Sequence, residues 1–128
     1  MADVTPIKKL LVANRGEIAR RIMRTAHDMG ISTVAIFAEG DARAPFVNEA
    51  DTAIFLEGRT STETYLDVEK VINACKRSGA DAVHPGYGFL SENEGFAQAI
   101  IDAGIKWIGP SPEVIGLMGD KLSAKNLM

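Results

Sequence analysis

Residues 9–29, KLLVANRGEIARRIMRTAHDM, join two different patterns at one turn. The first five residues form a short, mostly apolar run, which is typical of a buried parallel strand. From Glu17 onward the apolar residues recur with the period of a helix, and arginines occupy the opposite face. The turn at residues 14–16 separates the two patterns, and Gly30 is a stop signal for the helix.

The same alternation of strand and helix patterns continues along the chain. Strands are predicted at residues 9–13, 33–37, 53–56, 82–84 and 106–108, and helices at 17–29, 65–76, directly after 91–94 and at 112–118. The segment around Gly40 and Pro45 is expected to be a polar loop. Alternating strands and helices predict an α/β fold, with a Rossmann-like, mostly parallel sheet and helices on both faces.

Two of the predicted helices carry signals for their N-terminal ends. Thr64, with Asp67 three residues later, is expected to cap one helix. Ser91 and Glu94 have the S-x-x-E form of a capping box, so Ser91 is expected to cap another. Cys75 lies on the apolar side of its helix and is expected to be a core residue.

Length and composition favour a single cytoplasmic domain. The chain has 128 residues, of which 46% are hydrophobic and 24% charged. A formal net charge of −3 argues against nucleic acid or an anionic membrane as the partner. One cysteine permits no internal disulfide, which fits a reducing compartment. The sequence shows no secretory signal pattern and no apolar run long enough to span a membrane.

Three unusual loops follow predicted strands, at residues 14–16, 84–93 and 109–111. Ligands of parallel α/β sheets bind at the carboxyl ends of the strands, so these loops are expected on one edge. The loop HPGYGFLSEN, residues 84–93, is the most specific, because Gly86 and Gly88 allow a ligand to approach the main chain.

Each polar residue of these loops also has a structural interpretation. Arg15 stands at a helix start that suits an anion, but a tight turn with a solvated or paired arginine is favoured. His84 is expected to bond the backbone at a strand end, since no cysteine or second histidine stands at metal-ligand spacing. Lys121 can meet a phosphate or simply be exposed. The arginines of the first helix can form a solvated face or a protein interface.

Three segments together carry a resemblance to a known family. LLVANRGEIARRI (10–22), HPGYGFLSEN (84–93) and WIGPSPEVIGLMGDK (107–121) strongly resemble the N-terminal domain of biotin carboxylase. That component opens the biotin-dependent acyl-CoA carboxylases, and similar chains open pyruvate carboxylase and urea carboxylase. The resemblance runs from about Ile7 to Met128. It implies a pre-ATP-grasp domain at 1–118, and at 119–128 the start of a linker helix into an ATP-grasp domain.

The resemblance implies an activity for the complete enzyme. Such enzymes use Mg²⁺ and ATP to activate bicarbonate, and then carboxylate biotin held on a carrier protein or domain. A carboxyltransferase component passes the carboxyl group to the final acceptor, which this sequence leaves open. The carboxylates that hold magnesium, the catalytic base and the glycine-rich lid would lie beyond Met128. This chain is therefore expected to hold no catalytic residue or metal site and to be inactive alone.

The resemblance also assigns roles to particular residues. The lysine of the M-G-D-K motif, here Lys121, would contact ATP phosphates. The loop beside biotin corresponds to Gly86, Tyr87 and Gly88. First-helix arginines at the family's homodimer interface correspond to Arg21 and Arg24. Residues 38–43 follow the family pattern only loosely, which puts no catalytic role in doubt.

Two other functions are weighed against this one. A free-standing α/β module could bind a ligand or partner without catalysis. A nucleotide-dependent oxidoreductase is disfavoured, because the G-x-G-x-x-G fingerprint and the acidic residue after the second strand are missing. Carbamoyl-phosphate synthetase and other ATP-grasp ligases share the fold but lack HPGYGFLSEN in this form.

Overall fold

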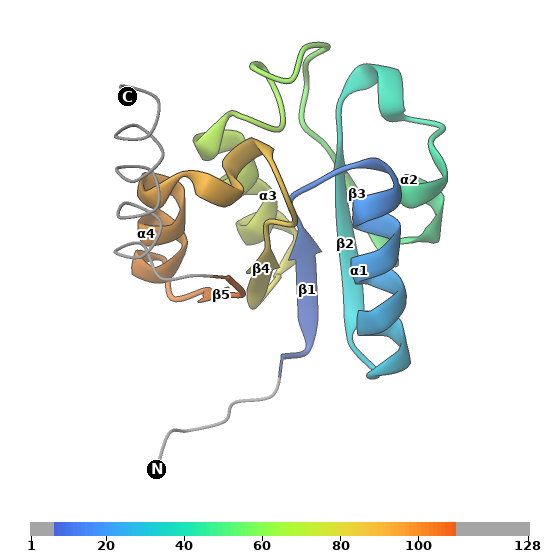
Figure 1. The fold of residues 1–128 in the computed structure, drawn as a ribbon, viewed down its shortest axis with the longest axis horizontal. Helices are drawn as coiled ribbons and strands as arrows, with labels where there is room; N and C mark the ends of the chain where they lie inside the picture. The colour runs from blue at the N-terminus through green and yellow to red at the C-terminus, as the bar shows by residue number, and fades with distance from the viewer. Residues whose placement is uncertain (1–6, 110–128) are drawn as a thin grey trace, which may run out of the picture.

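The computed structural model describes residues 7–109, which form one parallel sheet with helices packed on it (Figure 1). The five strands lie in the order β3-β2-β1-β4-β5, and each neighbouring pair is parallel. The elements are, in chain order, β1 (Lys9–Val12), α1 (Gly16–Asp28), β2 (Ser32–Phe37), the 3₁₀ turn η1 (Glu39–Asp41), α2 (Pro45–Glu49), β3 (Thr52–Phe55), α3 (Val68–Ser78), β4 (Ala82–His84), the 3₁₀ turn η2 (Phe89–Glu92), α4 (Glu94–Asp102) and β5 (Lys106–Trp107).

The strand order explains which helix lies on which face. From β1 the chain moves outward through β2 to β3, with α1 and α2 on one side of the sheet. It then returns through α3 to β4 on the other side of β1, which places α3 and α4 on the opposite face (Figure 1). This is the arrangement that right-handed crossovers require. The predicted parallel α/β fold with helices on both faces is confirmed.

Two hydrophobic clusters cover the two faces of the sheet. Successive side chains of a strand point to opposite faces, so Leu11 joins one cluster and Leu10 and Val12 join the other. The first cluster includes Phe96 of α4, and the second includes Phe46 of α2. Because β1 is buried on both faces, its sequence is a continuous apolar run and does not alternate.

The central strands β1 and β4 are joined beyond their ladder at both ends. At the amino ends, the carboxylate of Asp81 accepts from the backbone N–H groups of Lys8 at 3.0 and 3.2 Å and of Lys9 at 3.1 Å. At the carboxyl ends, the N–H of Ala13 donates to the carbonyl of His84 at 2.9 Å. The two strands therefore end together, and the loops that follow them leave the sheet at one place.

The expected cap of α3 is wrong. Asp67, and not Thr64, accepts a hydrogen bond from the N–H of Lys70 at 3.1 Å, so α3 begins at Val68. Thr64 is buried, and its hydroxyl donates to the carbonyl of Thr60 at 2.7 Å. Both residues have cap-forming side chains, and the tertiary position of the preceding loop decides between them.

The expected cap of α4 is also displaced. Asn93 accepts from the N–H of Phe96 at 2.9 Å and is the cap, while Ser91 lies inside η2. Ser91 and Glu94 therefore do not form a capping box. The 3₁₀ turn that displaces the helix start has no signal in the S-x-x-E pattern.

The segment expected to be a polar loop contains η1 and the short helix α2. Pro45 occupies its first turn, where a missing N–H costs nothing. Phe46 and Val47 are buried against the α1 side of the sheet. A helix of five residues is too short to show a helical period in the sequence.

Some expectations fall outside the described residues, and others are met. The helix at 112–118, the start of a helix near Asp120 and the boundary at residue 118 lie outside residues 7–109. Cys75 is fully buried in the core, as expected. Within the described residues, no helix combines the length and apolar character that crossing a membrane requires.

Candidate functional site

Two loops meet at the carboxyl edge of the sheet through the side chain of Asn14. Its Nδ2 donates to the carbonyl oxygens of Pro85 at 2.9 Å and Tyr87 at 2.6 Å. Its Oδ1 accepts from the N–H of Arg15 at 2.9 Å, and only 1% of the residue is exposed. The loops after β1 and β4 were expected at one edge, and the structure brings them into contact. The third loop, at 109–111, is described only at Gly109.

The two glycines of the 84–93 loop serve different needs. Gly86 has φ +66°, and a Cβ added to it would stand 2.6 Å from Nδ2 of Asn14. Gly88 has φ +74°, but an added Cβ would meet no atom within 4 Å. Both backbones favour glycine, and only Gly86 is also constrained by close packing.

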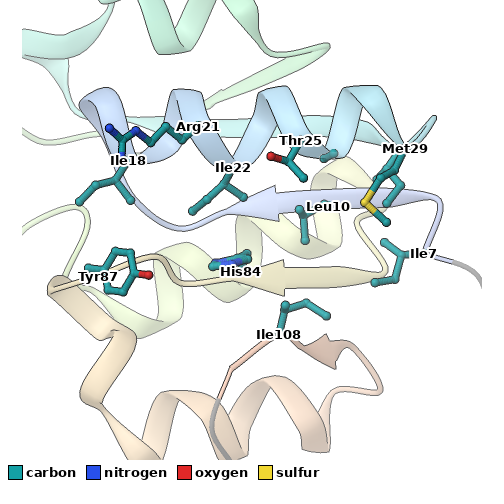
Figure 2. A pocket seen from close by; sticks show the side chains of 12 residues that line it. Ile7, Leu10, Ile18, Arg21, Ile22, Thr25, Met29, His84, Tyr87 and Ile108 are labelled. Atoms are coloured by element: carbon teal, nitrogen blue, oxygen red, sulfur yellow. The ribbon is translucent and has the colours of Figure 1, made fainter.

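Tyr87 projects from this loop and is 77% exposed. Figure 2 shows it at one end of an apolar groove, facing α1. The groove has a volume of about 420 Å³ and is lined by Ile18 and Ile22 of α1, by Met29 directly after this helix, and by Ile108 beyond β5. Tyr87 thus stands clear of the core, with its ring and hydroxyl accessible.

His84 stabilises the 84–93 loop by a hydrogen bond to its backbone. Its Nδ1 accepts a hydrogen bond from the N–H of Gly86 at 3.0 Å, so Nδ1 carries no proton. Burial lowers the pKa of His84, which favours the neutral ring that this hydrogen bond needs. The interpretation of His84 as a strand-end residue bonded to the backbone is confirmed.

Arg15 is paired, as the favoured interpretation of this turn allowed. Its Nε donates to Oδ2 of Asp41 at 2.7 Å, and a second nitrogen bonds Oδ1 of the same carboxylate. The hydroxyl of Tyr65 donates to Oδ2 of Asp41 at 2.6 Å and accepts from the N–H of Ala38 at 3.1 Å. This network, which sequence reasoning missed, ties the loop after β1 to the loop after β2.

Charge and burial set the pKa values in this network. The hydrogen bond from Arg15 is the largest effect on Asp41 and holds the pKa of that carboxyl below its usual value. Burial raises the pKa of Tyr65, so its hydroxyl remains protonated and can donate. With its guanidinium engaged by Asp41, Arg15 is not a freely available anion ligand, although 49% of its side chain is exposed.

Phe89 connects the same network to the 84–93 loop. Its ring lies 5.2 Å from that of Tyr65, centroid to centroid. Its φ is +48°, which is uncommon for a residue other than glycine and indicates local strain. The segments that follow β1, β2, β3 and β4 are therefore joined by side-chain contacts from Asn14, Asp41 and Tyr65.

The remaining predicted site residues do not take part in the contact between Asn14 and the 84–93 loop. Arg21 borders the groove that Tyr87 closes (Figure 2). Arg24 borders a separate hollow between α1 and Glu49 of α2. Lys121 lies outside the described residues. Within residues 7–109, no group of three or more histidine, cysteine or carboxylate side chains gathers at metal-binding distance.

The contrast between the two glycines generates a first prediction. Gly86→Ala and Gly88→Ala each place a side chain at positive φ, and Gly88, with φ +74° and ψ −166°, occupies a backbone region that is essentially restricted to glycine. Gly86→Ala also forces the new methyl group against Asn14, which adds about 1–3 kcal/mol. In urea unfolding, Asn14→Ala should therefore reduce the cost of Gly86→Ala and leave the cost of Gly88→Ala unchanged. A cost of Gly86→Ala that does not depend on the residue at position 14 would contradict the close packing of Gly86 on Asn14.

The Asp41 network generates a prediction on pH. The pKa of Asp41 is lower in the folded protein than its usual 3.8, so the unfolded chain binds more protons between those values. Stability from this pair is therefore fully present above pH 3.8 and is lost as pH falls through the folded pKa. In urea unfolding, Asp41→Asn should be destabilising at neutral pH, and its deficit should shrink in acid.

A matched control for this pH experiment is Glu39→Gln. Glu39 pairs with Arg59 at 2.9 Å, but both side chains are more than half exposed. Exposed pairs contribute little to stability, so this variant should differ little from the unchanged protein at any pH. A deficit of Asp41→Asn that stays constant across the acid range would contradict the network.

Comparisons with known proteins agree on one family. The model of the family described as the biotin carboxylase N-terminal domain matches residues 6–115. The alpha3 subunit of a biotin-dependent acyl-coenzyme A carboxylase from Mycobacterium leprae is 57% identical over 121 residues, which cover 94% of this chain and 20% of that protein. A biotin carboxylase from Halalkalibacterium halodurans is 50% identical over 121 residues, 94% of this chain and 27% of that protein.

A solved structure shows the same fold. A multifunctional pyruvate carboxylase from Rhizobium etli superimposes with a TM-score of 0.88 at 45% identity, over 96% of this chain and 12% of that one. This chain thus spans well under a third of each of these proteins. The family model covers most of the chain, which shows that this protein belongs to the family of biotin carboxylase N-terminal domains.

Proposed function

We propose that this chain is the N-terminal domain of an ATP-dependent biotin carboxylase, a ligase that carboxylates biotin on a carrier with bicarbonate. The observation that carries the proposal is the family match, which includes the HPGYGFLSEN segment. Relatives named as biotin carboxylase, acyl-coenzyme A carboxylase and pyruvate carboxylase share biotin as the carboxyl carrier, and this chemistry is proposed for the complete protein here.

The proposed biotin side of the domain is the loop of Gly86, Tyr87 and Gly88. Tyr87 is exposed, and the space beside Gly88 is open. The N–H of Gly88 has no acceptor among residues 7–109, so it is available to a ligand. An open backbone beside an exposed aromatic ring suits a small planar polar group, such as the ureido ring of biotin.

The proposed ATP contact is Lys121. Its support is the sequence M-G-D-K at residues 118–121 within the resemblance to the family. A lysine ammonium is a compact point charge that suits phosphate oxygens. Mg²⁺ would accompany ATP, and its ligands are proposed to lie beyond Met128.

The proposed partners are a biotin carboxyl carrier protein or domain, a carboxyltransferase component and a second copy of the enzyme. Arg21 and Arg24 are proposed to lie at the homodimer interface, because both are exposed on α1 and arginine is enriched at interfaces. A cytoplasmic location is proposed from the single, reduced Cys75.

Catalysis is proposed to need more protein than these residues. The carboxyl edge offers backbone groups, an aromatic ring and a paired arginine. Phosphoryl and carboxyl transfer require preorganised cations and a base around the reacting atoms. The role proposed for this domain is to bind and orient biotin and to complete the nucleotide site.

The proposed function predicts that this chain is inactive alone and that a longer protein containing it is active. Bicarbonate-dependent ATP hydrolysis with free biotin should be absent from the 128-residue chain and present when the reading frame is extended past Met128. The assay measures phosphate release with and without bicarbonate. Inactivity of an extended and folded protein would overturn the proposal and favour a binding module without catalysis.

The two proposed ligand contacts predict opposite kinetic changes. In the complete protein, Tyr87→Ala should raise KM for free biotin more than KM for ATP, because the loop lies on the biotin side. Lys121→Ala should raise KM for ATP more than KM for biotin. Steady-state kinetics with each substrate varied in turn measures both, and each variant is the control for the other. Equal changes in both constants would contradict the assignment.

A further inference from the structure

We propose that Asn14 is a positioning residue that holds the loop of residues 85–88 in its ligand-receiving conformation. Asn14 would not touch the ligand. It would act through the backbone carbonyls of Pro85 and Tyr87, to which it donates. The assignment rests on the proposed function in one respect, namely that this loop receives biotin.

The orientation of the Asn14 amide follows from its partners. Both loop groups are carbonyl oxygens, so only the NH₂ end can face them. The other end then lies at the N–H of Arg15, which needs an acceptor and finds Oδ1 at 2.9 Å. The amide is 1% exposed, and water cannot readily replace these hydrogen bonds.

No other small side chain supplies the same bonds in this space. Asp would place carboxylate oxygens against two carbonyl oxygens, and Leu has no donor. Ser has one hydroxyl proton for two carbonyls. A Cβ added at Gly86 would stand 2.6 Å from Nδ2 of Asn14, so residue 86 has no room for a side chain beside this amide. Asn at this position and Gly at 86 therefore fit each other.

The two hydrogen bonds fix two peptide planes of the loop. With no cis peptide bond, the C=O and N–H of each peptide point in opposite directions. Turning the carbonyls of Pro85 and Tyr87 toward Asn14 therefore turns the N–H groups of Gly86 and Gly88 away from it. The N–H of Gly86 bonds Nδ1 of His84, and the N–H of Gly88 has no acceptor among residues 7–109. A buried side chain thus fixes the direction of an N–H group that has no acceptor among the described residues.

Asp81 provides a matched control. It joins β1 and β4 at their amino ends, by bonding the backbone of Lys8 and Lys9, as Asn14 joins the loops at their carboxyl ends. Asp81→Ala therefore removes a tie between the same two strands and leaves the loop intact. Any effect that comes from lost stability alone should appear in both variants.

The test compares Asn14→Leu, Asp81→Ala and Tyr87→Ala in the complete protein. Asn14→Leu should raise KM for free biotin about 10- to 100-fold, as expected when a binding group is misplaced by about 1 Å. KM for ATP should change by less than about twofold, since only the biotin side is disturbed. Asp81→Ala should leave both constants nearly unchanged. Asn14→Ser, which keeps one donor, replaces Asn14→Leu if the latter does not fold.

Hydrogen exchange of the 128-residue chain gives a second measurement that does not depend on activity. Asn14→Leu should speed exchange at the amides of Gly86 and Ser91, both of which are bonded within this segment. Asp81→Ala should speed exchange at Lys8 and Lys9 instead. Uniform acceleration along the chain by Asn14→Leu would show a general structural role and overturn the inference.

The outcomes separate this inference from the proposed function. If Tyr87→Ala raises KM for biotin and Asn14→Leu does not, the positioning role is overturned and the proposed function stands. If neither variant changes KM for biotin, the loop is not the biotin site. Exchange then decides about Asn14: acceleration confined to the loop supports the positioning role, and uniform acceleration overturns it.

Discussion

The side-chain amide of Asn14 is the constraint on which the carboxyl edge of this domain depends. It bonds two carbonyl groups that lie 71 and 73 residues further along the chain, and it does so from a fully buried position. The requirement for glycine at 86 follows from the position of this amide, which also fixes the carbonyl group of Tyr87. Because β1 pairs with β4 in parallel, Asn14 after β1 lies beside Pro85 and Tyr87 after β4, so the sheet topology itself brings the two loops together.

Two kinds of contact join the loops of this edge, and they differ in the free-energy cost of burying the groups involved. The side chain of Asn14 is neutral, so burying it with its hydrogen bonds made costs little. Asp41 is a largely buried carboxylate, and it is tolerated because Arg15 and Tyr65 both donate to it. Loops that carry binding residues usually need such support from the scaffold, since a rigid site loses less entropy when its ligand binds.

The strands, and the placement of helices on both faces of the sheet, could be predicted from the sequence, because a parallel sheet buried on both sides requires apolar runs. The prediction of the helix caps failed, because several neighbouring side chains can serve as caps. Asp67 and Asn93 replaced Thr64 and Ser91 as caps, since all four side chains can cap and packing selects among them. Gly86 and Gly88 were recognised by their conformational freedom. Asn14 was missed because a polar residue after a strand does not reveal that it will be buried under a loop seventy residues away; the tie to Asp41 was missed for the same reason.

The pair of ties at the two ends of β1 and β4 has a mechanical consequence. Asp81 holds the amino ends and Asn14 the carboxyl ends, so the strands cannot slide by a residue without breaking both. The 85–88 loop is therefore held rigidly on the sheet. For the ligand proposed at this edge, any movement that opens or closes the site would have to come from another part of the protein, and the 85–88 loop would keep one conformation.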